Sequence, residues 1–147
     1  MVKIAPSILS ADLLKILSEV KAIDKAGAEY IHIDIMDGNY VPNITFGPNI
    51  VKSIKSITNK TLDVHLMINK VNKLIDDFIE AGSDIISFHP ETESNTTDIL
   101  KIIKNANIQC GIAIHPEIEV KGIRKYLELV DLVIVMTVVP GFGGQKF

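Results

Sequence analysis

The sequence His32-Ile33-Asp34, together with His65, carries side chains that are able to bind a divalent cation. In an extended segment, a two-residue spacing places His32 and Asp34 on one face, about 7 Å apart along the chain. His65 lies at a similar level of the next apolar segment, residues 61–67. Two imidazoles and a carboxylate are nitrogen and oxygen donors that suit zinc, iron, manganese or cobalt. The spacing predicts a metal site, and the alternative interpretation is a set of interior polar residues that satisfy one another.

Asp34 is also a candidate general base. A carboxylate beside a metal and inside a fold can be tuned by its surroundings toward acid–base chemistry. The alternative is that Asp34 serves only as a ligand and has no role in proton transfer.

Two loops contain residues that could contact a ligand. The segment Pro140-Gly141-Phe142-Gly143-Gly144 follows an apolar run, and its glycines would let backbone N–H groups approach an anion such as phosphate. A tight turn without a ligand is the alternative. Residues 37–48 form a long, turn-rich loop, and long loops in compact domains are often functional, although a plain surface loop has the same composition.

Three methionines, Met36, Met67 and Met136, share a register in their apolar segments. Methionine usually fills gaps in a core, but three at one level could instead line a water-poor pocket. Ser7 lies near the C-terminal end of the first apolar segment, where its hydroxyl could either hydrogen-bond a ligand or cap a turn.

Two further histidines, His89 and His115, each precede a Pro-Glu pair. This pattern indicates corners between strands and helices, so both are predicted to lie outside the metal site. The single cysteine, Cys110, begins an interior segment and is expected to be inert. One cysteine excludes an intrachain disulfide or a cysteine-based metal site, and it favours a reducing, cytoplasmic location.

Six apolar, β-branched segments recur about 25 residues apart and predict the elements that position these residues. They lie at residues 2–8, 30–36, 61–67, 84–88, 109–114 and 131–139. Amphipathic stretches fill the intervals, with apolar residues at helical spacing. This alternation, without hairpin signals, predicts six parallel strands joined by right-handed helical crossovers.

The strands themselves favour a (β/α) barrel over a doubly wound sheet. Residues 30–36 and 61–67 each have one apolar face and one face that becomes polar toward its C-terminal end, where barrel enzymes keep their chemistry. A closed barrel of this type needs eight strands. We therefore expect residues 1–147 to be a single, partial TIM (β/α)8 barrel domain of about six βα units, truncated before strands seven and eight. The alternative is that another chain supplies the missing wall.

Composition agrees with a single globular domain. The chain has 147 residues, of which 47% are hydrophobic and 22% charged. The net charge of -3 argues against a nucleic-acid partner. No apolar run is long enough to cross a membrane, and the N-terminus lacks the core of a signal peptide.

Five strings, in order along the whole chain, resemble those of the ribulose-phosphate 3-epimerase family. They are APSILSAD at 5–12, HIDIMDG followed by VPNITFGP within 32–48, LDVHLM at 62–67, and MTVVPGFGGQKF at 136–147. The resemblance implies interconversion of D-ribulose 5-phosphate and D-xylulose 5-phosphate in the pentose phosphate pathway. It also implies a homo-oligomer that binds a sugar phosphate.

The resemblance also assigns roles to residues. It implies that His32, Asp34 and His65 bind one divalent metal, with zinc first among the candidates. It implies that Asp34 is one of two acid–base carboxylates that invert C3 through an enediolate, the second belonging to a seventh strand. The residues expected to contact substrate are Ser7, His65, Gly141, Phe142, Gly143 and Gly144, and those expected to line the site are Met36, Met67 and Met136.

Because strands seven and eight are expected to be missing, the chain by itself is predicted to be an inactive fragment. Two alternatives stay open. One is an epimerase of the same family that acts on a six-carbon ketose phosphate, and the other is a non-catalytic partial barrel.

Overall fold

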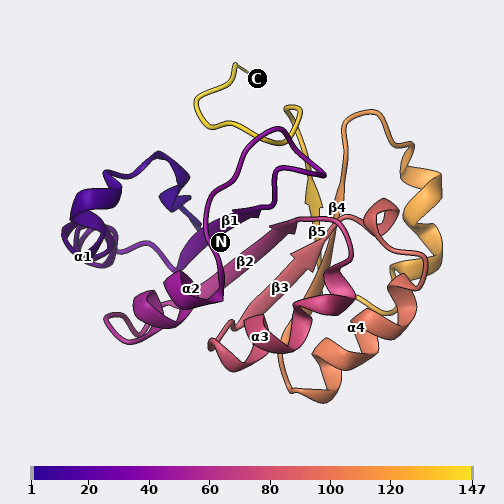
Figure 1. The fold of residues 1–147 in the computed structure, drawn as a ribbon, viewed down its shortest axis with the longest axis horizontal. Helices are drawn as coiled ribbons and strands as arrows, with labels where there is room; N and C mark the ends of the chain where they lie inside the picture. The colour runs from indigo at the N-terminus through magenta and orange to yellow at the C-terminus, as the bar shows by residue number, and fades with distance from the viewer. Residues whose placement is uncertain (1, 147) are drawn as a thin grey trace.

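The computed structural model describes residues 2–146, and its centre is one sheet of five parallel strands in the order β1-β2-β3-β4-β5 (Figure 1). Met1 and Phe147, the two ends of the expected domain, lie outside the described residues. The strands are β1 (Tyr30–Met36), β2 (Thr61–Met67), β3 (Ile85–Phe88), β4 (Gln109–Ile114) and β5 (Leu132–Val135). Each strand pairs with the next one along the chain, whereas a doubly wound sheet reverses its order. The arrangement is that of a partial (β/α) barrel.

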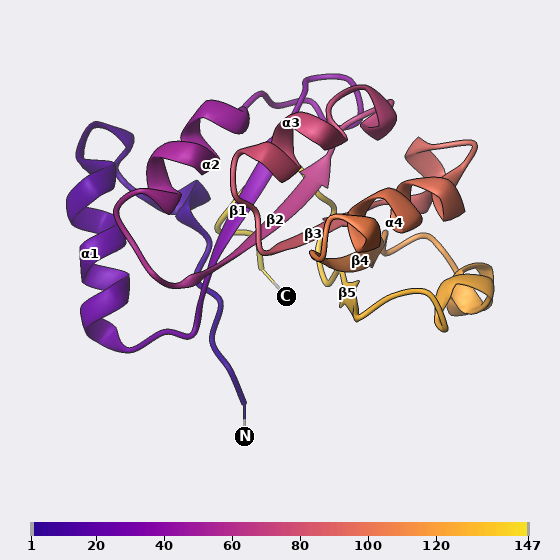
Figure 2. The same cartoon turned by 90° about the horizontal axis from the view of Figure 1, so that it is seen from below.

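Helices connect the strands, and α2, α3 and α4 cover the same side of the sheet (Figure 2). Within the described residues, the α-helices are α1 (Ile16–Ala26), α2 (Pro48–Lys55), α3 (Ile75–Glu80) and α4 (Thr96–Asn105). Short 3-10 helices are η1 (Ile8–Ser10), η2 (Leu13–Lys15), η3 (Val71–Lys73), η4 (Pro90–Thr92) and η5 (Val120–Tyr126). None of the helices within residues 2–146 is both long and apolar enough to cross a membrane.

Local signals in the sequence explain two of the helix boundaries. Pro48 occupies the first turn of α2, where its missing N–H group costs no helical hydrogen bond. Gly27 ends α1 in the left-handed conformation, with a φ of 84°, which residues with a Cβ adopt only at a cost.

The core lies between the sheet and the helices. On β1 the side chains of Ile31, Ile33 and Ile35 are buried in the main hydrophobic cluster, as are the alternate residues of β2. A second, smaller cluster of Met36, Met67 and Val41 lies at the C-terminal ends of β1 and β2. The opposite face of these two strands therefore remains available for polar side chains, as the alternation predicted.

The structure corrects the expected count of six strands. Within residues 2–146, the segment 2–8 is not a strand but runs beside β1 through hydrogen bonds from Tyr30 N to Ile4 O and from His32 N to Pro6 O, and through a bridge between Ser7 and His32. Pro6 has no N–H group to donate, and the chain turns into η1 directly afterwards, so a regular ladder does not form.

The last two expected elements also differ from the prediction. The amphipathic stretch before the final strand forms the 3-10 helix η5 in place of an α-helix. The final strand covers Leu132–Val135 within the expected range 131–139. The register of the polar residues on β1 and β2 is unaffected, because these differences lie elsewhere in the chain.

Candidate metal centre

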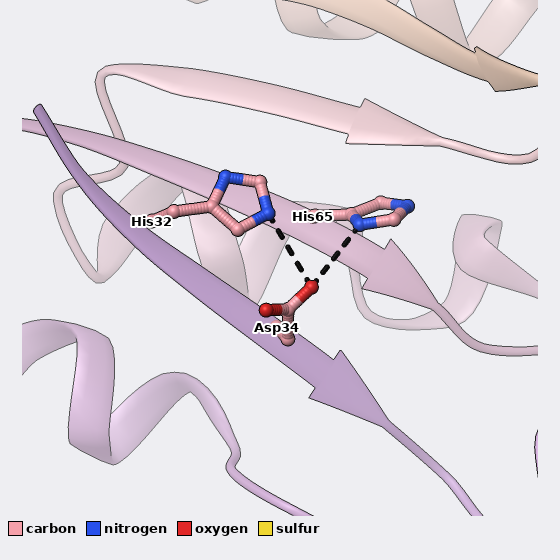
Figure 3. Close-up of side chains that lie close together, drawn as sticks. All are labelled: His32, Asp34 and His65. Carbon is pink, nitrogen blue, oxygen red and sulfur yellow. Dashed lines mark hydrogen bonds and ion pairs between the residues drawn. The ribbon is translucent and has the colours of Figure 1, made fainter. Parts of the chain in front are cut away.

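Strand pairing brings the predicted ligands together on neighbouring strands. In the β1–β2 register Asp34 lies opposite His65, and His32 lies opposite Asp63. One potential ligand atom from each of His32, Asp34 and His65 lies within 4.8 Å of the others (Figure 3). Asp34 Oδ1 is central, 3.3 Å from His32 Nε2 and 3.2 Å from His65 Nδ1. The geometry agrees with the predicted common face of the three side chains.

Burial and neighbouring charges shift the pKa values of His32, Asp34 and His65 in different ways. Burial lowers the pKa of His32, but hydrogen bonds with Asp34 and Asp63 outweigh that effect and raise it to about 10. Burial also raises the pKa of Asp34, yet its contacts with His32 and His65 hold that pKa well below the usual range. Burial lowers the pKa of His65, so its ring is neutral. The ionised carboxylate of Asp34 is ready to ligate a cation, the neutral ring of His65 can ligate through whichever nitrogen carries no proton, and His32 must first lose a proton.

The donor set fits a divalent cation. Two imidazole nitrogens converge on one carboxylate oxygen from two adjacent strands, and each strand is fixed by its ladder hydrogen bonds. Nitrogen and oxygen donors of this kind suit zinc and other first-row divalent metals. His32, Asp34 and His65 are therefore the residues that could hold the metal.

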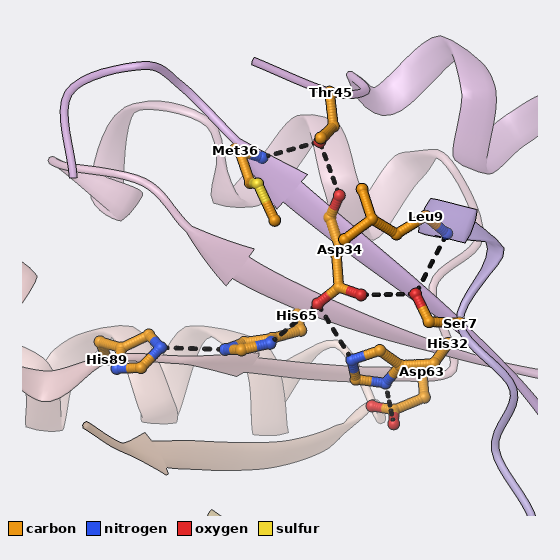
Figure 4. A network of polar contacts seen from close by, with 9 residues as sticks. All are labelled: Ser7, Leu9, His32, Asp34, Met36, Thr45, Asp63, His65 and His89. Atoms are coloured by element: carbon orange, nitrogen blue, oxygen red, sulfur yellow. Dashed lines mark hydrogen bonds and ion pairs between the residues drawn. The ribbon is translucent and has the colours of Figure 1, made fainter. Parts of the chain in front are cut away.

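Ser7 and Thr45 fix the Asp34 residue from two sides (Figure 4). The Ser7 hydroxyl donates to Asp34 Oδ2 at 2.6 Å and accepts a hydrogen bond from Leu9 N at 3.1 Å. Ser7 therefore caps the following turn and also contacts the carboxylate of Asp34. Thr45 Oγ1 donates to the Asp34 carbonyl oxygen at 2.6 Å and accepts from Met36 N at 3.0 Å. Thr45 thereby ties the 37–48 loop to β1.

Two residues around the cluster were missed by sequence reasoning. Asp63 Oδ2 lies 2.7 Å from His32 Nδ1, and His89 Nε2 lies 3.0 Å from His65 Nε2. His89 does form the corner after β3 that the Pro-Glu pair indicates, but it also contacts a predicted ligand. The sequence could have indicated Asp63, because its two-residue spacing from His65 places both side chains on the same face of β2. His115 does not belong to the cluster of candidate ligands among the described residues.

A cavity of about 260 Å³ lies beside the cluster. It brings together Ser7, Asp34, the three methionines and the glycine-rich segment after β5. Its lining residues are Ser7, Leu9, Ser10, Asp34, Met36, Met67, Met136, Val138, Pro140, Gly141, Phe142, Gly143 and Gly144. His65, which was also expected to contact substrate, does not line this cavity; its Nδ1 faces Asp34 instead.

The glycine-rich segment is held against the 37–48 loop. Asn43 Nδ2 donates to the Gly141 carbonyl oxygen at 2.8 Å, although the two residues are 98 positions apart. At Gly143 a Cβ atom would lie only 2.8 Å from Ser10 Oγ, so a side chain there would require the neighbour to move. Because Gly143 has no side chain, its backbone can lie close to Ser10 in the cavity wall.

The sequence model that describes the "Ribulose-phosphate 3 epimerase family" matches residues 3–147 of this chain. A ribulose-phosphate 3-epimerase of Bacillus subtilis is 46% identical over 147 residues, which are 100% of this chain and 68% of the relative. One from Synechocystis is 47% identical and is covered to 64%, with 98% of this chain matched. The chloroplastic ribulose-5-phosphate-3-epimerase of Arabidopsis thaliana is 44% identical and is covered to 52%, again with 98% of this chain matched.

The chain thus spans 52–68% of the length of these relatives. A solved structure of Yersinia pestis DHPS with a pterine-sulfa conjugate is similar in fold, with a TM-score of 0.60. The likeness covers 86% of this chain and 50% of that one, at 12% identity. It supports the αβ architecture and carries no information about the reaction.

Proposed function

Because this chain belongs to the ribulose-phosphate 3-epimerase family, we propose that the protein is a metal-dependent epimerase that inverts C3 of a ketopentose phosphate. The proposed reaction interconverts D-ribulose 5-phosphate and D-xylulose 5-phosphate in the pentose phosphate pathway. The main support for this proposal is the location of Asp34. Its carboxylate contacts both imidazoles, and the residue also lines the cavity.

We assign His32 Nε2, Asp34 Oδ1 and His65 Nδ1 as the atoms that would hold one divalent metal ion, with zinc first among the candidates. When bound, such an ion supplies electrophilic stabilisation of negative charge on neighbouring substrate oxygens. His32 retains the proton that ion binding must displace, since its pKa is raised to about 10. Metal affinity is therefore expected to increase with pH.

Asp34 is the proposed acid–base residue on one face of the sugar. A C–H group beside a ketone is a weak acid, so a positioned and ionised carboxylate is needed to remove its proton. The Ser7 hydroxyl, 2.6 Å from Asp34 Oδ2, fixes the orientation of this carboxylate toward the cavity. Removal of the C3 proton gives a planar enediolate, and return of a proton to the same face would restore the starting sugar.

Inversion requires a second proton donor on the opposite face of the enediolate. Of the described residues that line the cavity, only Asp34 carries a carboxylate. We assign the second acid–base carboxylate to a part of the protein outside residues 2–146. This assignment agrees with the longer relatives, which extend well beyond the matched region.

The rest of the cavity supports a small phosphorylated substrate. Backbone N–H groups of the glycine-rich segment Gly141–Gly144 could approach a phosphate closely, because glycine leaves them uncovered. Met36, Met67 and Met136 give the cavity an apolar wall that would limit exchange of the abstracted proton with water. A homo-oligomeric assembly and a cytoplasmic location remain predictions from the sequence.

The proposal is tested by proton exchange in D₂O with the full-length gene product that contains residues 1–147. The zinc-loaded protein is incubated with D-ribulose 5-phosphate, and NMR follows deuterium at C3 and formation of D-xylulose 5-phosphate. We expect both, and we expect chelation of the metal to abolish both. A metal-loaded, folded protein that neither exchanges the C3 proton nor forms the product contradicts the proposal. A six-carbon ketose phosphate, offered in parallel, separates the two substrate classes.

A further inference from the structure

A row of polar side chains leads from His65 through buried His89 to the surface. His65 Nε2 lies 3.0 Å from His89 Nε2, and His89 Nδ1 lies 3.4 Å from Glu91 Oε1. The Tyr40 hydroxyl donates to the same Glu91 oxygen at 2.8 Å. The His65 and His89 side chains are only 2% and 0% exposed, whereas Glu91 is 33% exposed. The row therefore joins a predicted metal ligand to a solvent-accessible carboxylate (Figure 4 shows its buried end).

The contact between the two histidines restricts where their protons lie. A neutral imidazole has one N–H group and one lone pair, so one of the two Nε2 atoms must donate and the other must accept. A His65 ring that ligates a cation through Nδ1 needs its lone pair on that atom, which places its proton on Nε2. His65 Nε2–H then donates to His89 Nε2, and His89 carries its own proton on Nδ1.

Glu91 is the acceptor that this arrangement requires. His89 Nδ1 is buried and lacks a hydrogen bond of good geometry to any described residue, and Glu91 Oε1 is the polar atom beside it. A buried N–H group without an acceptor is unfavourable, so the carboxylate of Glu91 favours the tautomer with the proton on Nδ1. Tyr40 donates to this carboxylate and packs its ring against His89, with ring centroids 4.9 Å apart.

We propose that Glu91, acting through His89, is a positioning residue that favours the His65 tautomer with its proton on Nε2, so that the Nδ1 lone pair is free to bind a cation held beside Asp34 Oδ1. The inference rests on the proposed metal centre. It adds to that centre an outer hydrogen-bonded chain, comparable to the carboxylate partners that orient metal-bound histidines in other proteins. Through Tyr40, the same chain connects the metal centre to the 37–48 loop.

The tautomers can be read directly by long-range ¹H–¹⁵N NMR of the histidine rings in the zinc-loaded protein. We expect protons on His65 Nε2 and His89 Nδ1. Calorimetry then compares zinc affinity among variants, and loss of an outer-shell partner typically lowers metal affinity by about 10–100-fold. Glu91→Ala is expected to fall in that range and to move the His89 proton toward Nε2. Glu91→Gln keeps an acceptor oxygen and is expected to lose less affinity.

Glu93→Ala is the matched control, because Glu93 lies just after the same turn but hydrogen-bonds Asn72 N at 3.0 Å instead of His89. Its zinc affinity is expected to equal that of the wild type. A proton on His89 Nε2 in the zinc-loaded wild type overturns the inference, as does unchanged affinity in both Glu91 variants. Failure of the folded wild-type protein to bind zinc overturns the metal centre itself and the positioning role with it. If Glu91→Ala does not fold, the zinc affinity of Glu91→Gln and the tautomers in the wild-type NMR spectrum still test the positioning role of Glu91.

Discussion

The Asp63 carboxylate lies across the β1–β2 pair from His32, with Oδ2 only 2.7 Å from the imidazole Nδ1. The other ring nitrogen, Nε2, is 3.3 Å from Asp34 Oδ1. Asp63 Oδ1 is buried and has no hydrogen-bond partner among the described residues, so the carboxylate interacts with His32 through Oδ2 alone. A carboxylate on the far nitrogen fixes the ring plane of a metal-binding histidine and increases its basicity.

Asp63→Asn is therefore expected to weaken zinc binding by about 10–100-fold, because His32 loses its charged partner. Isothermal titration calorimetry measures the affinity. Asp76→Asn, which removes a charge from the exposed side of α3, is the matched control and should leave binding unchanged. Equal affinity in Asp63→Asn and wild type would show that Asp63 does not support the site.

Asp34→Asn is expected to lower the rate of C3 proton exchange by at least about 100-fold, since positioned acid–base groups commonly contribute 10²–10⁴-fold. The amide keeps the size of the side chain but cannot accept the C3 proton. NMR in D₂O gives the exchange rate. The assay is run at a zinc concentration that saturates the variant, because Asp34 is also a proposed ligand. Exchange at the wild-type rate would remove Asp34 from the acid–base role.

His65→Ala is expected to lower the zinc content of the purified protein, since the substitution deletes a nitrogen donor from the cluster. Elemental analysis after dialysis measures the metal retained per chain. His115→Ala is the matched histidine control, because His115 is not part of the cluster in the described residues. If His65→Ala and His115→Ala retain the same zinc as the wild type, the assignment of His65 as a ligand is wrong.

The metal-free protein is expected to lose stability as pH increases from neutral to about 10. The pKa of His32 is 6.5 in an unfolded chain and is raised to about 10 in the folded one. The resulting stabilisation is complete below the unfolded value and is lost as pH rises through the folded value. Urea denaturation between pH 6 and 10.5 tests this, and Asp63→Asn should flatten the dependence. Parallel curves for the two proteins would contradict the assignment.

Gly111→Ala is expected to destabilise the fold by about 1–3 kcal/mol, the usual cost of overpacking a core. A Cβ atom at Gly111 would lie 2.8 Å from Leu132 Cγ and 3.1 Å from Ser87 Cβ, on the two neighbouring strands. Gly122→Ala is the control, because the nearest atom to its Cβ is 3.7 Å away. Thermal denaturation compares the variants. Equal melting temperatures would mean that Leu132 moves aside without cost.

Local patterns predicted much of the fold. The alternation of residues 30–36 and 61–67 predicted two strands with one apolar and one polar face, and the structure confirms both. The expected first strand was wrong, because apolar, β-branched residues favour extension but do not ensure pairing. Pro6 and the turn at η1 limit the pairing of that segment with β1 to two backbone hydrogen bonds and a bridge.

The sequence by itself determined the residue types of the candidate metal centre and the face on which His32, Asp34 and His65 lie, because side-chain direction alternates strictly along a strand. Only the tertiary structure decided which strand positions stand opposite each other, and so placed Asp63 against His32 and His89 against His65. These contacts depend on register and on backbone direction beyond the strand ends. Both are set by packing between segments more than twenty residues apart, which no local pattern encodes.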